Sequence, residues 1–427
     1  MLGAFVSAVK VPELRRKLLF TFSIMALFRL GSVMPTPGTN TGAIRECLRT
    51  AEDSSTFGLV NLISGGALLQ LSVFALGIMP YITSSIIMQL LTVVIPRLER
   101  LKAEGESGTA KITQYTRYVT IALAILQSTV IVSLARAGRL IGDCPGLLPD
   151  TSVVRVGTIV ITMTAGTAMI MWLGELITDR GIGNGMSLLI FTSIASSLPG
   201  EGGRILASAG AFVFTIVLLL GLVIVVGVIA IEQSQRRIPV QYAKRMIGRR
   251  QYGGTQTYIP MKVNQAGVIP VIFASSLLYL PQLLGQVVSN QGVKDFIATY
   301  LTQGDHPLYM LLYTALIIFF AYFYTAITFN TVEISDNMKK YGGFIPGIRP
   351  GRPTAEYLDY ILNRITLPGA LFLSLITVGP FMLLSLTKDN TFPFGGTAVL
   401  IMVGVGLETV KQIESQLMMR NYEGFLR

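Results

Sequence analysis

The side chains that support metal, redox or nucleotide chemistry are scarce in this sequence. His306 is the only histidine, and Cys47 and Cys144 are the only cysteines, so no cluster with metal-ligand spacing exists. Residues 181–185 resemble a nucleotide-binding turn, but no strand precedes them, and we interpret them as a flexible entry to a helix. No Gly-Lys dipeptide occurs, which excludes a P-loop. We therefore expect no metal, no cofactor and no enzymatic activity, and any energy source must belong to a partner.

Charged side chains are equally rare within the apolar parts of the chain. Arg29 is the single clear charge inside a predicted membrane span. The glutamates at positions 175, 232, 333 and 408 fall at the ends of spans, where water can reach them. Proton- and ion-coupled carriers retain charges inside the membrane for their function. The sequence therefore disfavours a proton-coupled carrier.

The composition indicates a membrane protein. Of 427 residues, 51% are hydrophobic and 13% are charged, and that charged share is about half the share in a soluble protein. The mean hydropathy of +0.60 comes from long apolar runs, which predicts an all-α polytopic membrane protein and excludes an ordinary cytosolic enzyme. Ten runs are long enough to cross a bilayer, at residues 18–34, 71–95, 118–134, 153–173, 185–198, 209–231, 266–284, 308–331, 365–386 and 394–409.

The basic residues predict the orientation of these spans. The net charge is +11, and an even number of spans places both termini on one side of the membrane. The segments on that side hold roughly three times as many Lys and Arg as the other segments, which predicts that both termini are cytoplasmic. Cys47 and Cys144 then lie in outer loops, either as one disulfide or as two free thiols.

The first long apolar region is interrupted. Residues 57–95 exceed the length of one span but fall short of two, and Ser64, Gly65 and Gly66 break the run. We expect a short half-helix at about residues 57–68 that enters the membrane and returns before a true span, because irregular backbone at that depth must be surrounded by protein or a water-filled cavity. A surface amphipathic helix is the alternative.

A repeated motif relates two parts of the chain. Residues 77–85 and 267–275 share Gly, Pro, Ile and Ser in register, in the second and the seventh span. We predict two halves of five spans each, residues 1–200 and 201–427, with opposite orientations because five is an odd number. Two unrelated proline kinks are the alternative reading.

The repeated motif also supplies isoleucines. If the two spans face each other, Ile78, Ile82 and Ile272 project into a shared interior as an apolar constriction that blocks water and ions by dewetting. Such a ring has no hydrogen-bonding groups, and it suits a varied substrate better than a small selective solute. The alternative is that these isoleucines face lipid.

Two predicted cytoplasmic loops, residues 232–265 and 333–364, are more basic than membrane orientation requires. Arginine-rich loops with glycines and tyrosines can bind structured RNA or an acidic protein face. An anchor beside anionic lipid is the alternative, but it explains only part of these loops. Their basic residues include Arg236, Arg237, Lys244, Arg245, Arg249, Arg250, Lys262, Lys339, Lys340 and Arg349.

Several runs, in order along nearly the whole chain, resemble the SecY family, the channel subunits of the bacterial protein-translocation machinery. These runs are residues 61–68, 74–82, 114–118, 179–185, 236–245, 264–270 and 346–351. The resemblance implies ten transmembrane helices in two inverted five-helix halves, a re-entrant plug helix and a lateral gate that opens to lipid. It implies a protein-conducting channel of the general secretory pathway, in the cytoplasmic membrane of a bacterium, that passes unfolded preproteins and releases hydrophobic segments into lipid. The partners that it implies are SecE, SecG, the SecA ATPase, the ribosome, preprotein signal sequences and membrane lipids.

Residue roles carry over from the family by motif. The plug comprises Asn61, Leu62, Ile63, Ser64, Gly65, Gly66 and Ala67. The pore ring comprises Ile78, Ile82, Met186, Ile190, Ile272 and Ile401, where Met186 departs from the usual isoleucine. The lateral gate is lined by Thr92 and Gln127 with Ser275 or Ser276. The surface for SecA and the ribosome comprises Arg236, Arg237, Lys244, Arg245, Arg249, Arg250, Lys339, Lys340 and Arg349, the last of which matches the arginine that the family needs for export.

Two other functions compete with a protein-conducting channel. A secondary transporter with inverted repeats predicts saturable, ion-coupled uptake of a small solute. A membrane scaffold that only recruits cytosolic partners predicts that polar replacement of Ile78, Ile82 and Ile272 has no consequence.

Overall fold

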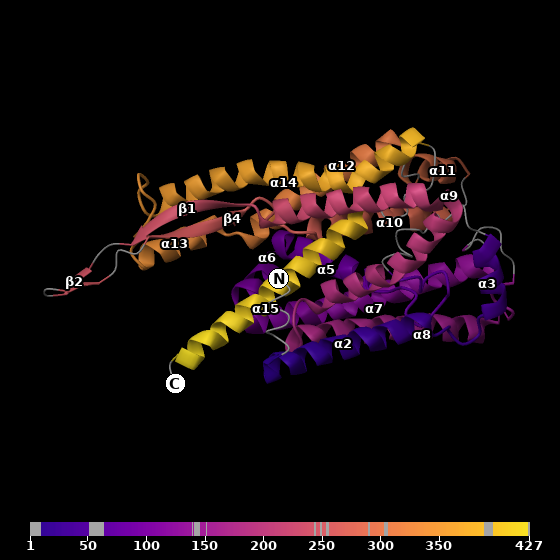
Figure 1. Cartoon of the computed structure of the whole chain (residues 1–427). Coiled ribbons are helices and arrows are strands. Elements are labelled where there is room, and N and C mark those ends of the chain that lie inside the picture. The colour runs from indigo at the N-terminus through magenta and orange to yellow at the C-terminus, as the bar shows by residue number, and fades with distance from the viewer. Residues whose placement is uncertain are drawn as a thin grey trace.

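The computed structural model describes residues 10–425 apart from 51–63, 139, 141–145, 151, 243–244, 248–249, 253–255, 289–290, 303–305 and 388–395. The described residues are mainly helical, and most long helices lie side by side (Figure 1). The helices are α2 (Pro12–Val33), α3 (Thr41–Thr50), α5 (Met79–Val94), α6 (Pro96–Ala103), α7 (Glu106–Arg136), α8 (Val153–Arg180), α9 (Gly185–Gln233), α10 (Ile269–Val287), α11 (Gln291–Ile297), α12 (Pro307–Thr328), α13 (Thr331–Lys340), α14 (Arg352–Thr387) and α15 (Gly396–Phe425), with a π-helix at Ala298–Thr302.

Each predicted span falls on one of these helices, and α9 contains both the fifth and the sixth. Within the described residues, six helical segments are long and apolar enough to cross a membrane, and α5 joined to α6 across a 99° bend makes a seventh. The apolar part of α10, Ile269–Tyr279, is shorter. The chain is therefore an all-α, multi-pass membrane protein.

The second span begins later than predicted. The helix α5 starts at Met79, and residues 64–78 before it form successive turns with one isolated bridge at Ser72. Gly77 has a φ of 57°, which a helix cannot continue through. Residues 57–63 of the predicted half-helix lie outside the described residues, and residues 64–71 are turns rather than helix.

The junction between the fifth and sixth spans also differs from the prediction. The sequence places a break at 199–208, but α9 continues through Pro199 and bends at Gly210, where φ is 80° and ψ is 171°. Within the segment after the bend, Gly210–Gln233, an 18-residue stretch has a mean hydropathy of 3.2, and only 6% of that stretch is buried. Its side chains therefore face lipid or a partner over most of their surface.

The two basic regions predicted as loops contain strands. Strands β1 (Gln235–Tyr242), β4 (Gln256–Lys262) and β5 (Gly343–Phe344) form an antiparallel sheet in the order β4-β1-β5. Strands β2 (Arg245–Ile247) and β3 (Arg250–Tyr252) form a separate hairpin beyond it, at the end of the molecule in Figure 1. Because β1 pairs with β5, the two basic regions form one unit rather than two independent loops. This sheet has a small hydrophobic core of its own with α13 and α14, formed by Ile238, Val240, Met261, Met338, Ile345, Leu358, Ile361 and Leu362.

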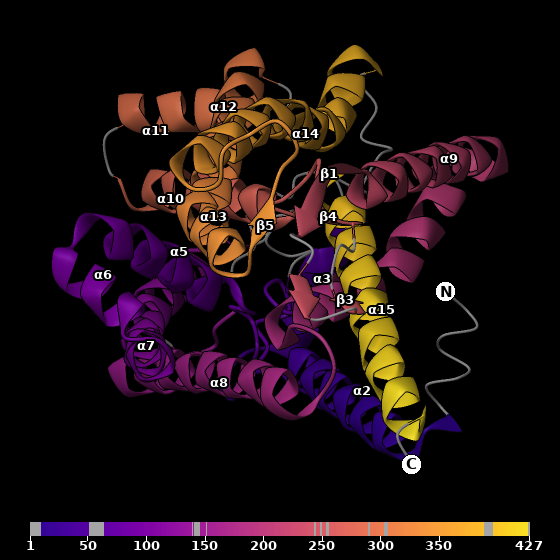
Figure 2. The same ribbon diagram turned by 90° about the vertical axis from the view of Figure 1, so that its left-hand side faces the viewer.

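The helices lie in two groups that meet at the centre. Viewed from one end, α2, α5, α6, α7 and α8 form one group and α10 to α14 form the other, with α9 and α15 at one side (Figure 2). The groups contact each other where α5 and α7 pack against α10. At the side, α9 packs against α2 and α8 of the first group and against α15, which in turn packs against α14 of the second group. One continuous hydrophobic cluster extends through both groups, and it contains five of the six predicted ring residues.

Candidate functional site

The repeated motif has the same local geometry in both copies. Gly77 and Gly267 have φ values of 57° and 60°. In each copy a helix begins two residues later, with proline as its second residue, and the amide four residues after Ile78 or Val268 donates to that residue's carbonyl. Proline is tolerated at this position because the first amides of a helix have no intrahelical acceptor. The prolines therefore start the two helices rather than kink them.

Five of the six predicted ring residues are buried inside the protein and do not face lipid. Their exposed fractions are 1% to 7%, and all five belong to the central hydrophobic cluster. They come from α5 or the turn before it, α9, α10 and α15, and are Ile78, Ile82, Ile190, Ile272 and Ile401. Since α5 packs against α10 and α9 against α15, the structure brings isoleucines from both parts of the chain into one apolar interior.

Met186 differs from the other five predicted ring residues. It is partly buried at the edge of the same cluster. A methyl group on Gly174 of α8 would overlap its sulfur and its terminal carbon, so the thioether occupies a notch that this glycine leaves open. Methionine fills such irregular gaps because its side chain is unbranched and flexible.

The segment of turns before α5 lies directly against two ring positions. A Cβ built on Gly77 would lie 3.4 Å from the Ser64 Cα, which places Ser64 beside the residue next to Ile78. A Cβ on Gly65 would lie 3.2 Å from the Cα of Ser193 on α9. Ser193 follows Ile190 by three residues, about 4.5 Å along the helix and on a similar face. Asn61, Leu62 and Ile63 of the predicted plug lie outside the described residues, whereas Ser64, Gly65 and Ala67 are buried and Gly66 is half-buried.

The far end of this segment is attached to the chain that follows α2. The backbone amide and Oγ1 of Thr36 both donate to the Leu71 carbonyl, at 3.0 and 2.7 Å, and the Val73 amide donates to the Met34 carbonyl at 2.9 Å. Leu71 is fully buried with a φ of 46°, an uncommon conformation for a non-glycine residue. The neighbouring Ser72 Oγ is buried without a hydrogen-bond partner. These residues fix one end of the segment and hold it in a strained backbone.

The predicted gate residues lie on α5, α7 and α10, the helices through which the two groups contact each other. Thr92 on α5, Gln127 on α7 and the serine pair on α10 are at most 8% exposed. Ser275 and Ser276 both donate to the Ile272 carbonyl, at 2.9 and 2.8 Å, and Thr92 donates to the Gln89 carbonyl at 2.7 Å. Within the described part of the chain, these three hydroxyls donate to carbonyls of their own helices rather than between α5, α7 and α10.

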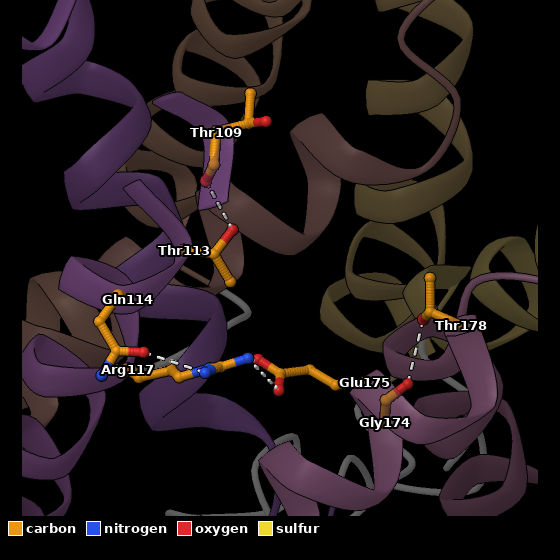
Figure 3. Close-up of polar contacts among 7 residues, drawn as sticks. All are labelled: Thr109, Thr113, Gln114, Arg117, Gly174, Glu175 and Thr178. Carbon is orange, nitrogen blue, oxygen red and sulfur yellow. Dashed lines mark hydrogen bonds and ion pairs between the residues drawn. The ribbon is translucent and has the colours of Figure 1, made fainter. Parts of the chain in front are cut away.

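A bidentate ion pair, which the sequence reading did not single out, ties α7 to α8. Arg117 Nε and Nη2 donate to Glu175 Oε1 and Oε2 at 2.9 and 2.8 Å, and Arg117 Nη1 donates to the Gln114 side chain at 3.0 Å (Figure 3). Glu175 follows the Gly174 notch, and Thr178 one turn later donates to the Gly174 carbonyl and accepts from the Gly185 amide. Arg117 lies within one of the runs that resemble the SecY family, but that resemblance assigns it no role. The sequence feature that could have identified Arg117 is its position as a lone arginine directly before an apolar span.

The basic surface is built on the sheet. Arg236 and Arg237 are exposed on β1, and the Arg237 guanidinium lies 4.9 Å from the centre of the Tyr258 ring on β4. Arg245 and Arg250 lie on β2 and β3, whereas Lys244 and Arg249 fall outside the described residues. Lys339 and Lys340 are exposed at the end of α13, one strand away from β1. The β1–β5 pairing therefore joins both basic regions into one surface.

Arg349 is exposed in a turn whose backbone is held from several sides. Gly347 and Gly351, which flank it, have φ values of 84° and 98°. Thr354 Oγ1 donates to the Arg349 carbonyl at 2.8 Å, and the buried Ser335 Oγ donates to the Gly351 carbonyl at 2.6 Å. The backbone of this arginine is therefore fixed, while its charged group stays available to a partner.

The residues considered for metal or nucleotide chemistry have structural roles. Asn184 caps α9 by accepting from the Met186 and Ser187 amides, so residues 181–185 are a helix entry, as predicted. His306 caps α12 in the same way, through a bond from the Leu308 amide to Nδ1. Cys47 is disulfide-bonded, and Cys144 lies outside the described residues. Among the residues that the structure describes, no group of three His, Cys, Asp or Glu is placed to hold a metal ion.

These features define a class of protein: a polytopic membrane protein with an apolar interior shared by two helix groups and a buried, non-helical segment against it. The SecY family model matches residues 72–410. A protein translocase subunit SecY of Streptomyces galbus is 61% identical and that of Mycobacterium tuberculosis is 58% identical, each alignment covering 100% of both chains. The chain belongs to the SecY family.

Solved structures of lower sequence identity share the fold. A solved protein-conducting channel matches with a TM-score of 0.65 and 19% identity, over 93% of this chain and 91% of that chain. A SecY channel whose plug domain stabilises the closed state matches with a TM-score of 0.63 and 18% identity, with the same coverage. Sec61 in a canine ribosome–channel complex matches with a TM-score of 0.59 and 19% identity, again over 93% and 91%.

Proposed function

We propose that this chain is the channel subunit of a protein translocase, which passes unfolded preproteins across the membrane and releases hydrophobic segments sideways into lipid. The observation that carries this proposal is the shared apolar interior, in which buried isoleucines from both helix groups lie beside a re-entrant segment. The full-length SecY relatives, which are named protein translocase subunits, support it. The chain is a channel subunit rather than an enzyme, and the transporter alternative is not favoured.

The apolar ring explains how such a channel stays closed to ions. We assign the ring to Ile78, Ile82, Met186, Ile190, Ile272 and Ile401. A narrow passage lined by isoleucine and methionine offers water and ions no hydrogen-bond partner, so it empties of water when idle. The same lack of specific bonds lets any unfolded sequence slide past once the passage widens.

The re-entrant segment acts as the plug, and residues 61–67 are its core. Its described part lies against Gly77 and Ser193, next to ring residues Ile78 and Ile190. Hydrogen bonds to residues 34–36 fix its far end, so displacement of residues 64–66 opens the passage without releasing the segment. In the solved SecY channel of similar fold, the plug domain maintains a membrane seal.

The lateral gate lies between α5 and α7 on one side and α10 on the other. Its polar residues are Thr92, Gln127, Ser275 and Ser276, and the three hydroxyls among them donate to carbonyls of their own helices. A hydrophobic segment inside the channel leaves through this seam because lipid lowers its free energy, by roughly 0.3 to 0.6 kcal/mol for each Leu, Ile, Phe or Val near the helix centre. The halves 1–200 and 201–427 are then the two bodies that separate when the gate opens.

The basic surface receives the cytosolic partners. Its exposed arginines and lysines suit the ribosome, which the canine Sec61 channel binds, and the acidic faces of a motor ATPase such as SecA. Arg349 is the contact needed for ATPase-driven export. SecE and SecG complete the membrane complex, and signal sequences and lipid meet at the gate. The excess of Lys and Arg on this side supports a cytoplasmic position for it and for both termini. The spans then lie in the cytoplasmic membrane of a bacterium.

Reconstitution tests this function directly. The chain is placed in vesicles with SecE, SecG and SecA, and a preprotein with a signal sequence is added with ATP. We expect protease-protected preprotein inside the vesicles, and no protection when the signal sequence is deleted. Saturable uptake of a small solute, without protected preprotein, would show a transporter instead.

A further inference from the structure

Arg29 is a charged residue in the last turns of α2, four residues before the helix ends at Val33, and its bond partner lies in the re-entrant segment. Its Nη1 donates to the Gly65 carbonyl at 2.7 Å. Among the described residues Arg29 forms no ion pair with an acidic side chain. A charge within a membrane span is costly, and proteins retain such charges for function.

Gly65 is closely surrounded by residues of two helices, which leave little room for a larger side chain. A Cβ at this position would lie 3.1 Å from Arg29 Nη1 and 3.2 Å from the Ser193 Cα, so the residue is held between α2 and α9. Its φ of 67° also favours glycine. The neighbouring Gly66 has a similar φ of 85°, but a Cβ there would meet nothing within 4 Å.

The two ends of the segment are held differently. Near residue 71 the bonds to Thr36 and Met34 include two from backbone amides, which cannot be broken without moving the chain between α2 and the segment. At Gly65 the bond comes from a flexible side chain. A long side chain can release its acceptor and keep its helix in place, so the Gly65 end is the one that can be freed.

We propose that Arg29 is a positioning residue that latches the plug in the closed channel through the Gly65 carbonyl. This inference rests on the proposed function, because it assigns a task to one contact of the plug. Arg29 does not touch the passing polypeptide. It sets how often residues 64–66 leave their position beside Ile78 and Ile190 when the channel is idle.

The test measures ion leak through the idle complex in vesicles. Loss of a hydrogen bond from a charged donor shifts an equilibrium about tenfold or more, so Arg29→Leu raises the leak about tenfold or more and admits preproteins with defective signal sequences. Arg29→Lys keeps the charge with a different reach and gives a smaller increase. Arg16→Leu removes an exposed charge from the start of the same helix and leaves the leak unchanged.

A double-mutant cycle separates the latch from a general loss of structure. Gly65→Ala raises the leak more than Gly66→Ala does, because both alanines meet an unfavourable φ but only the first meets Arg29 and Ser193. Combined with Arg29→Leu, Gly65→Ala adds less than it does in the parent chain, because only its unfavourable φ and its contact with Ser193 remain, whereas independent contacts would add fully. If Arg29→Leu fails to accumulate, Arg29→Lys and Gly65→Ala carry the same comparison.

The outcomes distinguish a failure of the Arg29 latch from a failure of the proposed channel function on which it rests. Unchanged leak in Arg29→Leu, or full additivity with Gly65→Ala, overturns the latch if Ile272→Asn still raises the leak. If Ile272→Asn also leaves the leak unchanged and no preprotein is protected, the proposed channel function is wrong as well.

Discussion

At the scale of single residues, the interior is built mainly from side chains that have no hydrogen-bonding groups. The buried isoleucines share one cluster, and the hydroxyls nearest to them, on Ser275 and Ser276, are bonded to the Ile272 carbonyl within α10. The passage is thereby left without a free hydroxyl donor from these two serines. Introducing a hydrogen-bonding side chain is therefore the most direct way to let water fill the passage.

Ile272→Asn introduces such a group. The amide can bond water in the passage, which lowers the cost of filling it. We expect a several-fold higher ion conductance of the idle complex in vesicles, together with export of preproteins that have weak signal sequences. Ile272→Leu keeps the position apolar and stays close to the parent chain. Equal conductance in both variants would place Ile272 outside the ring.

Gly174→Ala tests the notch that holds Met186. The added methyl overlaps the Met186 sulfur, and forced repacking of this kind costs about 1 to 3 kcal/mol. We expect a lower midpoint temperature for unfolding in detergent. Gly157→Ala on the same helix meets nothing within 4 Å and lowers the midpoint little or not at all, since alanine favours helix more than glycine. Equal effects of the two changes would contradict the notch.

At the scale of elements, the turn around Arg349 is the most constrained part of the basic surface. Its carbonyls accept bonds from Thr354 and from the buried Ser335, and β5 next to it pairs with β1. The position of Arg349 is therefore fixed relative to Arg236 and Arg237. The binding of a partner that contacts these three arginines is therefore expected to depend on the position of the charge at Arg349 as well as on its sign.

Arg349→Glu is expected to abolish ATPase-driven export while the complex remains assembled. The reason is that the reversed charge repels an acidic partner at a fixed contact. Arg352→Glu, three residues away, changes the charge equally at a residue engaged only in an exposed pair with Glu356, and it retains most of the export. ATP-dependent protection of a preprotein measures both. Equal loss in the two variants would show that only the total charge matters.

The sequence predicted the helices well because long apolar runs and the paired motif at Gly77 and Gly267 are strong local signals. It missed the sheet, although Ile238 and Val240 alternate with exposed residues, because the arginines around them favoured a solvated loop. The Met186 notch could not be predicted, since it depends on how α8 crosses α9. The bond from Arg29 to Gly65 joins residues that are far apart in the sequence. A periodic pattern of residues cannot predict such a pair.

At the scale of the whole molecule, the excess of positive charge is gathered on the side that carries the sheet. The net charge is +11, and exposed arginines and lysines from β1 and α13 lie on one joined surface. Exposed charges of one sign attract an oppositely charged macromolecule over about 10 Å at 0.1 M salt. Association with cytosolic partners is therefore expected to depend on ionic strength.

Raising the salt concentration from about 50 to 200 mM is expected to weaken ribosome or SecA binding to vesicles that contain the complex by an order of magnitude or more, as for other interfaces with several phosphate or carboxylate contacts. Co-sedimentation measures the bound fraction. The unfolding midpoint of the complex, measured over the same range, stays nearly constant because its core is apolar. Binding that is indifferent to salt would contradict an electrostatic docking surface.

The ribbon formed by β1 and β4 has a mechanical consequence. The first strand continues directly from α9, the second leads back toward α10, and Asn264 clamps the base by donating to Glu232 and to the Gly267 carbonyl. The two strands are hydrogen-bonded in register along their length, so a displacement of the hairpin formed by β2 and β3 is expected to move β1 and β4 together. The base of these strands lies next to Gly267, five residues before Ile272.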